Sequence, residues 1–233
     1  MTRALPFRIY LPPCYGKLEN TRYPSLYLFH GLGADDSQWD DLGIDERADD
    51  LITSQQSLPF LIIMPHQVKG IDMESALIDI LIPHIDRTYR ARPDPWFRAI
   101  GGLSRGGGLA LRIGLKHYDT FSTIGMHSPA NPYSAPYIVN WVTAIPPYAT
   151  PVIWIDIGDR DPLLKLTQEL ISLFSELNVT TEIQINPGDH DASYWSSQTG
   201  EYLRWYNDQW RTHMLSEAQQ SELPTENQTL RDP

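Results

Sequence analysis

The sequence predicts an α/β fold in which a mostly parallel sheet is covered by helices on both faces. Short apolar runs alternate with longer amphipathic segments, which is the chain order of strand–helix units. The apolar runs are rich in Ile, Leu, Val and aromatic residues and are often bounded by Pro or Gly, as buried strands are. The expected strands are residues 7–11, 25–30, 60–64, 97–103, 122–126, 152–157 and 181–185.

Segments of helical periodicity lie between these strands. We expect helices over residues 44–53, 72–89, 107–117, 162–177 and 200–214. In the second of these, apolar residues recur at the spacing of a helix that packs on a sheet: Leu77, Ile78, Leu81, Ile82 and Ile85.

The remaining segments complete the expected organisation. The link between the first two strands is short and rich in turn residues, so we expect an antiparallel start to the sheet. Residues 128–151 are rich in Pro, Tyr and Ala and predict a long ordered loop. Residues 1–214 are expected to form one domain, and the polar residues 215–233 a flexible tail.

Composition and charge exclude several classes of function. The chain has 233 residues and a formal net charge of -11, which argues against a nucleic-acid partner because phosphate binding needs clustered Lys and Arg. Cys14 is the only cysteine, and the histidines do not show zinc-site spacing, so we expect no metal and no cofactor. No apolar stretch is long enough to span a bilayer, which argues against a membrane partner. The N-terminus lacks a signal-peptide core, which predicts a cytoplasmic protein or a secreted one whose signal peptide has been removed.

The most informative motif is the run Gly102-Leu103-Ser104-Arg105-Gly106. It has the pattern G-x-S-x-G and lies between an expected strand and an expected helix, the context in which that pattern presents a nucleophilic serine. A tight turn holds the serine out from the carboxyl end of the strand, and the glycines let neighbouring chain pass close by. The alternative interpretation is a serine in a glycine-rich turn that only opens a helix.

A nucleophilic serine needs a base and an acid, and the chain provides both after later strands. Asp161 follows the strand 152–157, and His190 follows the strand 181–185. Asp161 precedes Pro162 and is compatible with a purely structural N-cap role, Asp159 is a competing acid, and Asp156 is a weaker one. His190 in turn is compatible with an ordinary surface-turn histidine.

The same mechanism needs two N–H donors for the developing oxyanion. One is expected to be the backbone N–H of Arg105, directly after the serine. The other is expected from the turn His30-Gly31-Leu32-Gly33, where we favour the N–H of Leu32.

Together these segments resemble the esterase D-type branch of the α/β-hydrolases, which includes feruloyl esterases, enterochelin esterase-like proteins, S-formylglutathione hydrolases and mycolyltransferases. The resemblance implies the α/β-hydrolase fold without a large cap domain, a triad of Ser104, Asp161 and His190, and an oxyanion hole from Leu32 and Arg105. It spans roughly residues 7–210. The matching pieces are Tyr10-Leu11-Pro12-Pro13, Tyr27-Leu28-Phe29-His30-Gly31-Leu32-Gly33, Gly101-Gly102-Leu103-Ser104-Arg105-Gly106-Gly107, Gly158-Asp159-Arg160-Asp161 and His190-Asp191-Ala192-Ser193-Tyr194-Trp195.

The chain departs from that family pattern in two places. Asp189 stands where many relatives have a second glycine before the histidine. The chain also begins almost at the Tyr10-Leu11 strand, so an outer strand common in relatives is expected to be missing, shortened or supplied by a partner.

These observations predict a serine carboxylesterase for short-acyl or aromatic, feruloyl-type esters. Its expected partner is a small-molecule ester, with carbohydrate-linked esters included. Acyl transfer to a sugar or alcohol and a non-catalytic binding module are the alternatives. The sequence does not indicate an oligomeric state. Aromatic residues near the strand ends are expected to line the substrate cleft, with ordinary packing as the alternative: Trp39, His127, Tyr133, Tyr137, Trp141 and Trp195.

Overall fold

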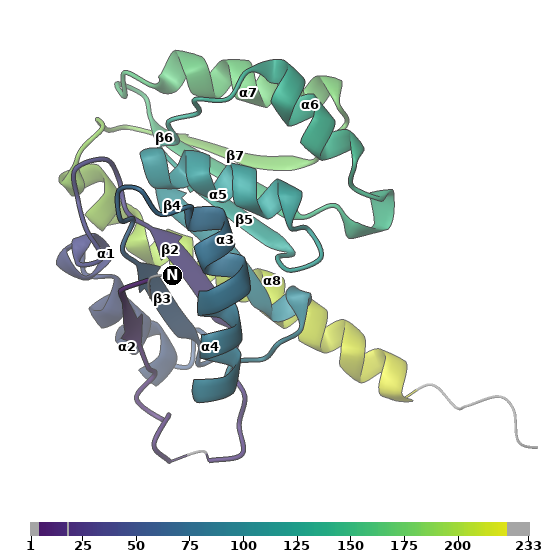
Figure 1. The fold of residues 1–233 in the computed structure, drawn as a ribbon. Coiled ribbons are helices and arrows are strands. Elements are labelled where there is room, and N and C mark those ends of the chain that lie inside the picture. The colour runs from purple at the N-terminus through teal and green to yellow at the C-terminus, as the bar shows by residue number, and fades with distance from the viewer. Residues whose placement is uncertain (1–4, 18, 223–233) are drawn as a thin grey trace, which may run out of the picture.

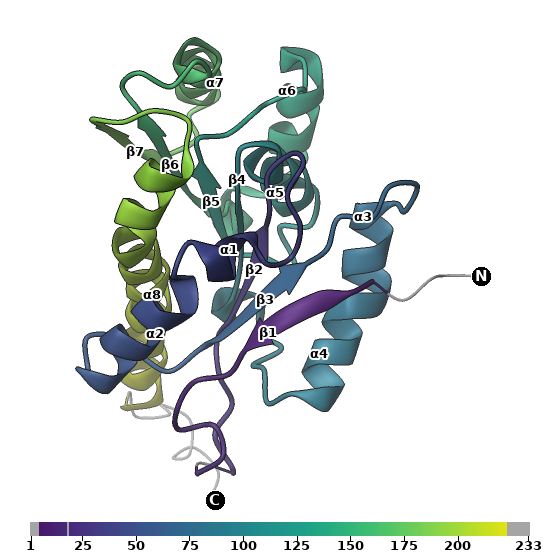
Figure 2. The same cartoon turned by 90° about the vertical axis from the view of Figure 1, so that its left-hand side faces the viewer.

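A single mixed sheet organises the protein in the computed structural model, which describes residues 5–17 and 19–222 (Figures 1 and 2). The sheet order is β1-β3-β2-β4-β5-β6-β7. β1 pairs antiparallel with β3, and every other ladder is parallel. The strands are β1 (Phe7–Tyr10), β2 (Ser25–Phe29), β3 (Leu61–Pro65), β4 (Arg98–Leu103), β5 (Thr123–His127), β6 (Val152–Gly158) and β7 (Thr181–Asn186).

All the expected strands are confirmed, each within one residue at either end. The antiparallel start is also present, but β1 pairs with β3 rather than with its chain neighbour β2. The parallel register brings the carboxyl ends of β2 to β7 to one edge of the sheet, where a ligand site is expected in such folds.

The helices divide between the two faces of the sheet (Figure 2). One apolar cluster contains side chains of α1, α2 and α8 with Leu26 and Leu28 of β2, and the other contains side chains of α4 to α7 with Tyr27 and Phe29. This alternation follows from the two-residue pleat of a strand. The helices are α1 (Gln38–Asp41), α2 (Ile44–Thr53), α3 (Met73–Ser75), η1 (Ala76–Leu81), α4 (Ile82–Thr88), η2 (Pro95–Phe97), α5 (Arg105–Lys116), α6 (Ala135–Thr143), η3 (Pro147–Ala149), α7 (Leu164–Glu176) and α8 (Ala192–Glu222).

The expectation of a loop over residues 128–151 is wrong in part, because this segment contains α6 and η3. Pro136 lies in the first turn of α6, where a proline costs no hydrogen bond. Ile138 is buried, and Trp141 and Val142 pack on the core. Tertiary packing therefore makes a helix from a composition that is typical of a loop.

The expectation of a flexible tail from residue 215 is also wrong in part. α8 begins at Ala192 rather than at residue 200 and continues to Glu222, and Glu217 pairs with Arg92 at 3.2 Å. Residues 192–199 are rich in Ser and Thr, which have modest helix propensity, so the sequence did not predict this part of the helix. Tyr194 and Trp195 are buried and hold the start of α8 against the sheet. The remainder of the expected tail, 223–233, lies outside the described residues. No helix in the described part of the chain is both long and apolar enough to cross a bilayer.

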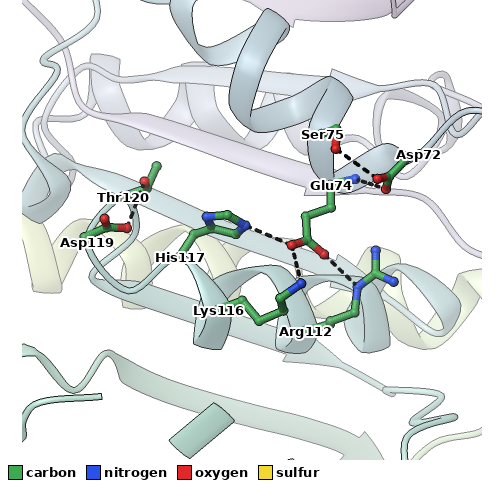
Figure 3. Close-up of polar contacts among 8 residues, drawn as sticks. All are labelled: Asp72, Glu74, Ser75, Arg112, Lys116, His117, Asp119 and Thr120. Carbon is green, nitrogen blue, oxygen red and sulfur yellow. Dashed lines mark hydrogen bonds and ion pairs between the residues drawn. The ribbon is translucent and has the colours of Figure 1, made fainter. Parts of the chain in front are cut away.

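A cluster of charges ties α3 to α5 (Figure 3). The Glu74 carboxylate accepts hydrogen bonds from Lys116 at 2.5 Å and His117 at 3.0 Å, and lies 3.4 Å from Nε of Arg112. Burial opposes ionisation of this carboxyl group, but the hydrogen bonds from Lys116 and His117 outweigh it and lower the pKa of Glu74. The start of α3 is thereby held against the helix that follows the Ser104 turn.

Packing of α8 on the sheet should contribute strongly to stability. Trp210 is fully buried, with its ring 5.3 Å from that of Phe60, whereas Leu215 on the same helix is 65% exposed. We expect Trp210→Ala to lower the free energy of unfolding by about 3–5 kcal/mol, because it empties a large core site. The matched control Leu215→Ala should change it by less than about 0.5 kcal/mol. Chemical denaturation of both variants checks this, and equal effects would contradict it.

Candidate active site

Ser104 occupies a strained turn between β4 and α5. Its φ is +53° and its ψ is -119°, a conformation that residues with a side chain rarely adopt. Hydrogen bonds hold the turn from both sides: Ser104 N–H donates to the carbonyl oxygen of His127 at 2.9 Å, and the carbonyl of Ser104 accepts from Ala130 N–H at 2.9 Å. The turn projects the side chain beyond the end of β4.

The two glycines of the motif let three backbone segments meet. A Cβ on Gly106 would lie 2.3 Å from the carbonyl oxygen of Phe29, and one on Gly102 would lie 2.5 Å from the carbonyl carbon of Gly106. Neither distance is sterically allowed. The end of β2, the end of β4 and the start of α5 therefore approach one another closely only because these positions lack side chains.

Three side chains from distant parts of the sequence form one hydrogen-bonded chain. His190 Nε2 lies 3.0 Å from Ser104 Oγ, and His190 Nδ1 lies 2.7 Å from Asp161 Oδ2. The Asp161 side chain is fully buried, and its other oxygen accepts from Leu163 N–H at 2.8 Å. The carboxylate favours the proton on Nδ1, which leaves the lone pair of Nε2 facing the serine hydroxyl. The arrangement can deprotonate Ser104.

The other two acids considered from the sequence have different partners. Asp159 is about half exposed and accepts from Gly188 N–H at 3.0 Å, so it braces the loop that carries His190. Asp156 is buried and pairs with His127 Nδ1 at 2.5 Å. Among the contacts of the described residues, Asp161 is the acid that reaches His190. It also caps the following turn through Leu163 N–H, so both roles considered for it are compatible.

The turn after β2 lies directly against the serine. A Cβ on Gly31 would lie 3.6 Å from Cβ of Ser104. Gly31 N–H donates to Gln38 Oε1 at 2.7 Å. In residues 5–17 and 19–222, the N–H groups of Leu32 and Arg105 donate to no protein acceptor. Two unused backbone donors on either side of a nucleophile are what an oxyanion requires.

Gln38, Gln67 and His30 support this turn, and sequence reasoning did not assign them a role. Gln67 N–H donates to His30 Nε2 at 2.9 Å, its side-chain amide donates to His30 O, and its Oε1 accepts from Arg105 at 2.8 Å. Gln67 comes just after β3, so its place at the same edge of the sheet as Ser104 could have indicated a role in the site. Burial lowers the pKa of His30, and the nearby charges of His66 and Arg105 lower it further. A neutral His30 can accept from Gln67 and donate through Nδ1 to Gly31 O, 2.9 Å away.

The expectation that Trp39 and His127 line a cleft is wrong. Trp39 is 1% exposed and donates from Nε1 to the carbonyl of Phe29, while His127 is fully buried against Asp156 and Tyr206. Trp195 is also largely buried. It donates from Nε1 to Ser128 Oγ at 3.1 Å and packs edge-on against the His190 ring, with centroids 4.9 Å apart, so it supports that ring.

The remaining aromatic residues lie together at α6. The rings of Tyr133 and Trp141 meet edge-on at 5.0 Å, and Tyr137, which is 62% exposed, stacks with Trp141 at 6.3 Å. Tyr133 lines a groove that Arg105 and Gln67 also line. Tyr133 therefore shares a groove with the residue that follows Ser104, and Trp141 and Tyr137 extend the aromatic cluster away from it.

One group of possible metal ligands exists in the described part of the chain: Asp94, His213 and Glu217, with ligand atoms within 4.8 Å. Arg92 already pairs with Glu217, and the His213 ring stacks on Trp96. Asp94 caps η2, which precedes β4, so this group lies at the opposite end of β4 from Ser104. It belongs to the anchoring of α8 rather than to the site.

Comparison with known proteins identifies the family. A family model described as "Putative esterase" matches residues 1–206. The chain belongs to this esterase family. The resemblance drawn from the sequence motifs is thereby confirmed.

Individual proteins that are similar to this chain agree with that assignment. The "Endo-1,4-beta-xylanase/feruloyl esterase" of Xylanibacter ruminicola is 31% identical over 169 residues, which are 66% of this chain but 22% of that relative's length. A ferulic acid esterase structure matches with a TM-score of 0.77 at 24% identity, covering 87% of this chain and 91% of that one. FphF, a fluorophosphonate-binding serine hydrolase of Staphylococcus aureus, matches with a TM-score of 0.73 at 18% identity, covering 86% and 91%. The predicted α/β-hydrolase fold is confirmed, and the described chain carries no large cap.

The buried His30 should make the stability of this esterase-family protein depend on pH. Because the pKa of His30 is lowered from its ordinary 6.5, the unfolded chain binds a proton more readily than the folded chain does. The neutral form of His30 therefore contributes its full stability above the ordinary pKa of 6.5. That contribution is lost as the pH falls below this value and the unfolded chain takes up a proton. We expect the unfolding free energy to fall more from about pH 7.5 to about pH 5 in the wild type than in His30→Gln. Denaturant titrations at both pH values check this, and parallel pH profiles would contradict it.

Proposed function

We propose that the protein is a serine carboxylesterase that hydrolyses carboxylic esters through an acyl-enzyme intermediate. Membership in the esterase family supports the reaction class. The observation that carries the mechanism is the continuous contact from Ser104 Oγ through the His190 ring to the buried Asp161 carboxylate, with distances of 3.0 and 2.7 Å. This is the arrangement of a nucleophile, its general base and the acid that orients the base.

The first half-reaction acylates the serine. Ser104 Oγ attacks the carbonyl carbon of the ester while His190 Nε2 takes the hydroxyl proton. The Asp161 carboxylate stabilises the imidazolium, and the N–H groups of Leu32 and Arg105 stabilise the negative oxygen of the tetrahedral intermediate. When the intermediate collapses, the bond to the alcohol oxygen breaks, and His190 gives its proton to that oxygen.

The second half-reaction releases the acid. His190 takes a proton from water, the resulting hydroxide attacks the acyl carbon, and the proton returns to Ser104 Oγ as the acid leaves. No large cap covers the serine in the described chain, so water has a path to the acyl-enzyme.

The substrates that we propose are short-acyl or aromatic, feruloyl-type esters, including esters linked to carbohydrate. Relatives named as feruloyl esterases support this choice. The partly exposed rings of Tyr133, Tyr137 and Trp141 also support it, because aromatic faces bind flat phenolic groups and sugars.

Removal of the nucleophile tests the mechanism. We expect Ser104→Ala to lower kcat for p-nitrophenyl acetate by about a million-fold, because the nucleophile is removed while the oxyanion hole remains. The variant should fold normally and should lose labelling by a fluorophosphonate, which the wild type should show. Retained activity or labelling in the variant would overturn the assignment, and an inert wild type would favour a non-catalytic binding role.

The choice of acid is tested by a matched pair of variants. Asp161→Asn keeps the size of the side chain but favours the wrong tautomer of His190, so kcat should fall by about 1,000- to 10,000-fold. Asp159→Asn keeps an oxygen acceptor for Gly188 N–H and should lower kcat by less than about tenfold, since Asp159 only braces the loop. Steady-state kinetics on one ester compares them. A larger loss in Asp159→Asn would make that residue the acid.

A further inference from the structure

A groove of about 650 Å³ begins at the residue that follows the nucleophile. One wall is a face of α5, and the other is the segment between β3 and α3 together with the residues before α6. Its polar and aromatic lining includes Gln67, Lys69, Asp72, Arg105, Arg112 and Tyr133.

The charge of this groove is opposite to that of the whole protein. Lys69, Arg105 and Arg112 line it against one acid, Asp72, whereas the chain as a whole carries a formal net charge of -11. The Asp72 carboxylate already accepts from Glu74 N–H at 3.1 Å and from Ser75 Oγ at 2.9 Å, where it caps α3. The groove therefore presents an excess of cationic groups.

Arg112 is the cation best placed to bind a ligand. Its Nε faces Glu74 at 3.4 Å, but Lys116 and His117 share that same carboxylate (Figure 3). In the part of the chain that the structure describes, no residue accepts a hydrogen bond from the two Nη groups of Arg112. Arg105 differs, because one of its Nη groups donates to Gln67 Oε1 at 2.8 Å.

The groove also has a direction. Arg105, Leu109 and Arg112 stand at spacings of four and three residues and so share one face of α5. Arg112 is seven residues beyond Arg105, or about 10 Å along the helix axis. Tyr133 lies beside Arg112, with the guanidinium carbon 6.0 Å from the ring centroid, so an aromatic wall accompanies the cation.

The ester's acyl part fits this groove better than its alcohol part. During turnover the leaving oxygen must lie within reach of His190 Nε2. The groove lining includes residues from the serine turn and from the Gln67 segment that supports the oxyanion turn, but none from the loops that carry Asp161 and His190. A group that extends along the groove is therefore attached on the acyl side of the carbonyl.

We propose that this groove binds an acyl group that carries a second acid function, and that Arg112 binds its distal carboxylate. The preferred substrates are then esters of dicarboxylic acids with a flat, extended acyl part. This inference rests on the proposed ester hydrolysis and specifies its substrate class.

The test compares two esters that differ only in charge. Methyl 4-carboxycinnamate carries the distal carboxylate, and methyl 4-carbamoylcinnamate carries a neutral amide of the same shape. We expect wild-type kcat/KM to be about tenfold higher for the carboxylate, the effect of one partly exposed charge-assisted hydrogen bond. Arg112→Gln should remove that preference and leave kcat/KM for the amide within about twofold.

A matched control separates the groove from overall charge. Lys165→Gln removes one positive charge from an exposed position on α7, outside the groove lining, and should keep the tenfold preference. If Arg112→Gln fails to fold, ionic strength gives the same information with the wild type. Raising NaCl from about 0.05 to about 0.5 M should reduce the preference several-fold, because salt screens the charge pair.

A second pair of esters tests the side on which the acid lies. The carboxymethyl and carbamoylmethyl esters of cinnamic acid place the same two groups on the alcohol, where we expect no preference. The proposal would be overturned if kcat/KM were higher for the carboxylate than for the amide only in the alcohol-side pair. It would also be overturned if neither pair showed a difference. The same experiment tests the proposed ester hydrolysis separately. If that proposal is right, the wild type hydrolyses methyl 4-carbamoylcinnamate and Ser104→Ala does not.

Discussion

The strained turn at Ser104 is the constraint on which the site depends. A positive φ at a residue with a side chain costs free energy, so surrounding structure must hold it. The backbone of β5 does so from one side through the carbonyl of His127, and Ala130 does so from the other. Close contact with the end of β2 is possible only at Gly102 and Gly106. These same contacts bring the oxyanion turn against the serine.

The buried network below the turn explains why β5 can supply this support. His127 pairs with Asp156, whose second oxygen accepts from Tyr194 at 3.0 Å and from Tyr202 at 2.9 Å. Burial raises the pKa of Tyr202 and the charge of Asp156 raises it further, so the phenol stays protonated and donates. Both oxygens of the buried carboxylate thus have hydrogen-bond partners, without which its desolvation would be costly. The tyrosines belong to α8, so the network also fixes α8 to β5 and β6.

The position of His190 follows from that attachment. α8 begins directly after the loop that carries His190, and its first turn contains Trp195, whose ring packs edge-on against the imidazole. The buried Asp161 carboxylate accepts from Nδ1 of the same ring. The base is therefore held by an acid from the loop after β6 and an aromatic ring from α8. The Asp156 network fixes β6 and α8 to each other. Asp189, which departs from the family pattern, pairs with Arg160 at 2.9 Å and links the histidine loop to the acid loop.

The sequence by itself determined the strands and the α/β class, and it predicted Ser104, Asp161 and His190 with Asp159 and Asp156 left as alternative acids. These depend on patterns within a few residues: apolar runs, a G-x-S-x-G turn, and polar residues after strand ends, where parallel strands must bring them together. Only the tertiary structure decided that β1 pairs with β3, that residues 135–143 form α6, and that Trp39 and His127 point into the core. Position after a strand does not determine the direction of a side chain, because that direction depends on which distant helix packs over it. The role of Gln67 was hidden for the same reason, since its partners His30 and Arg105 lie 37 and 38 residues away.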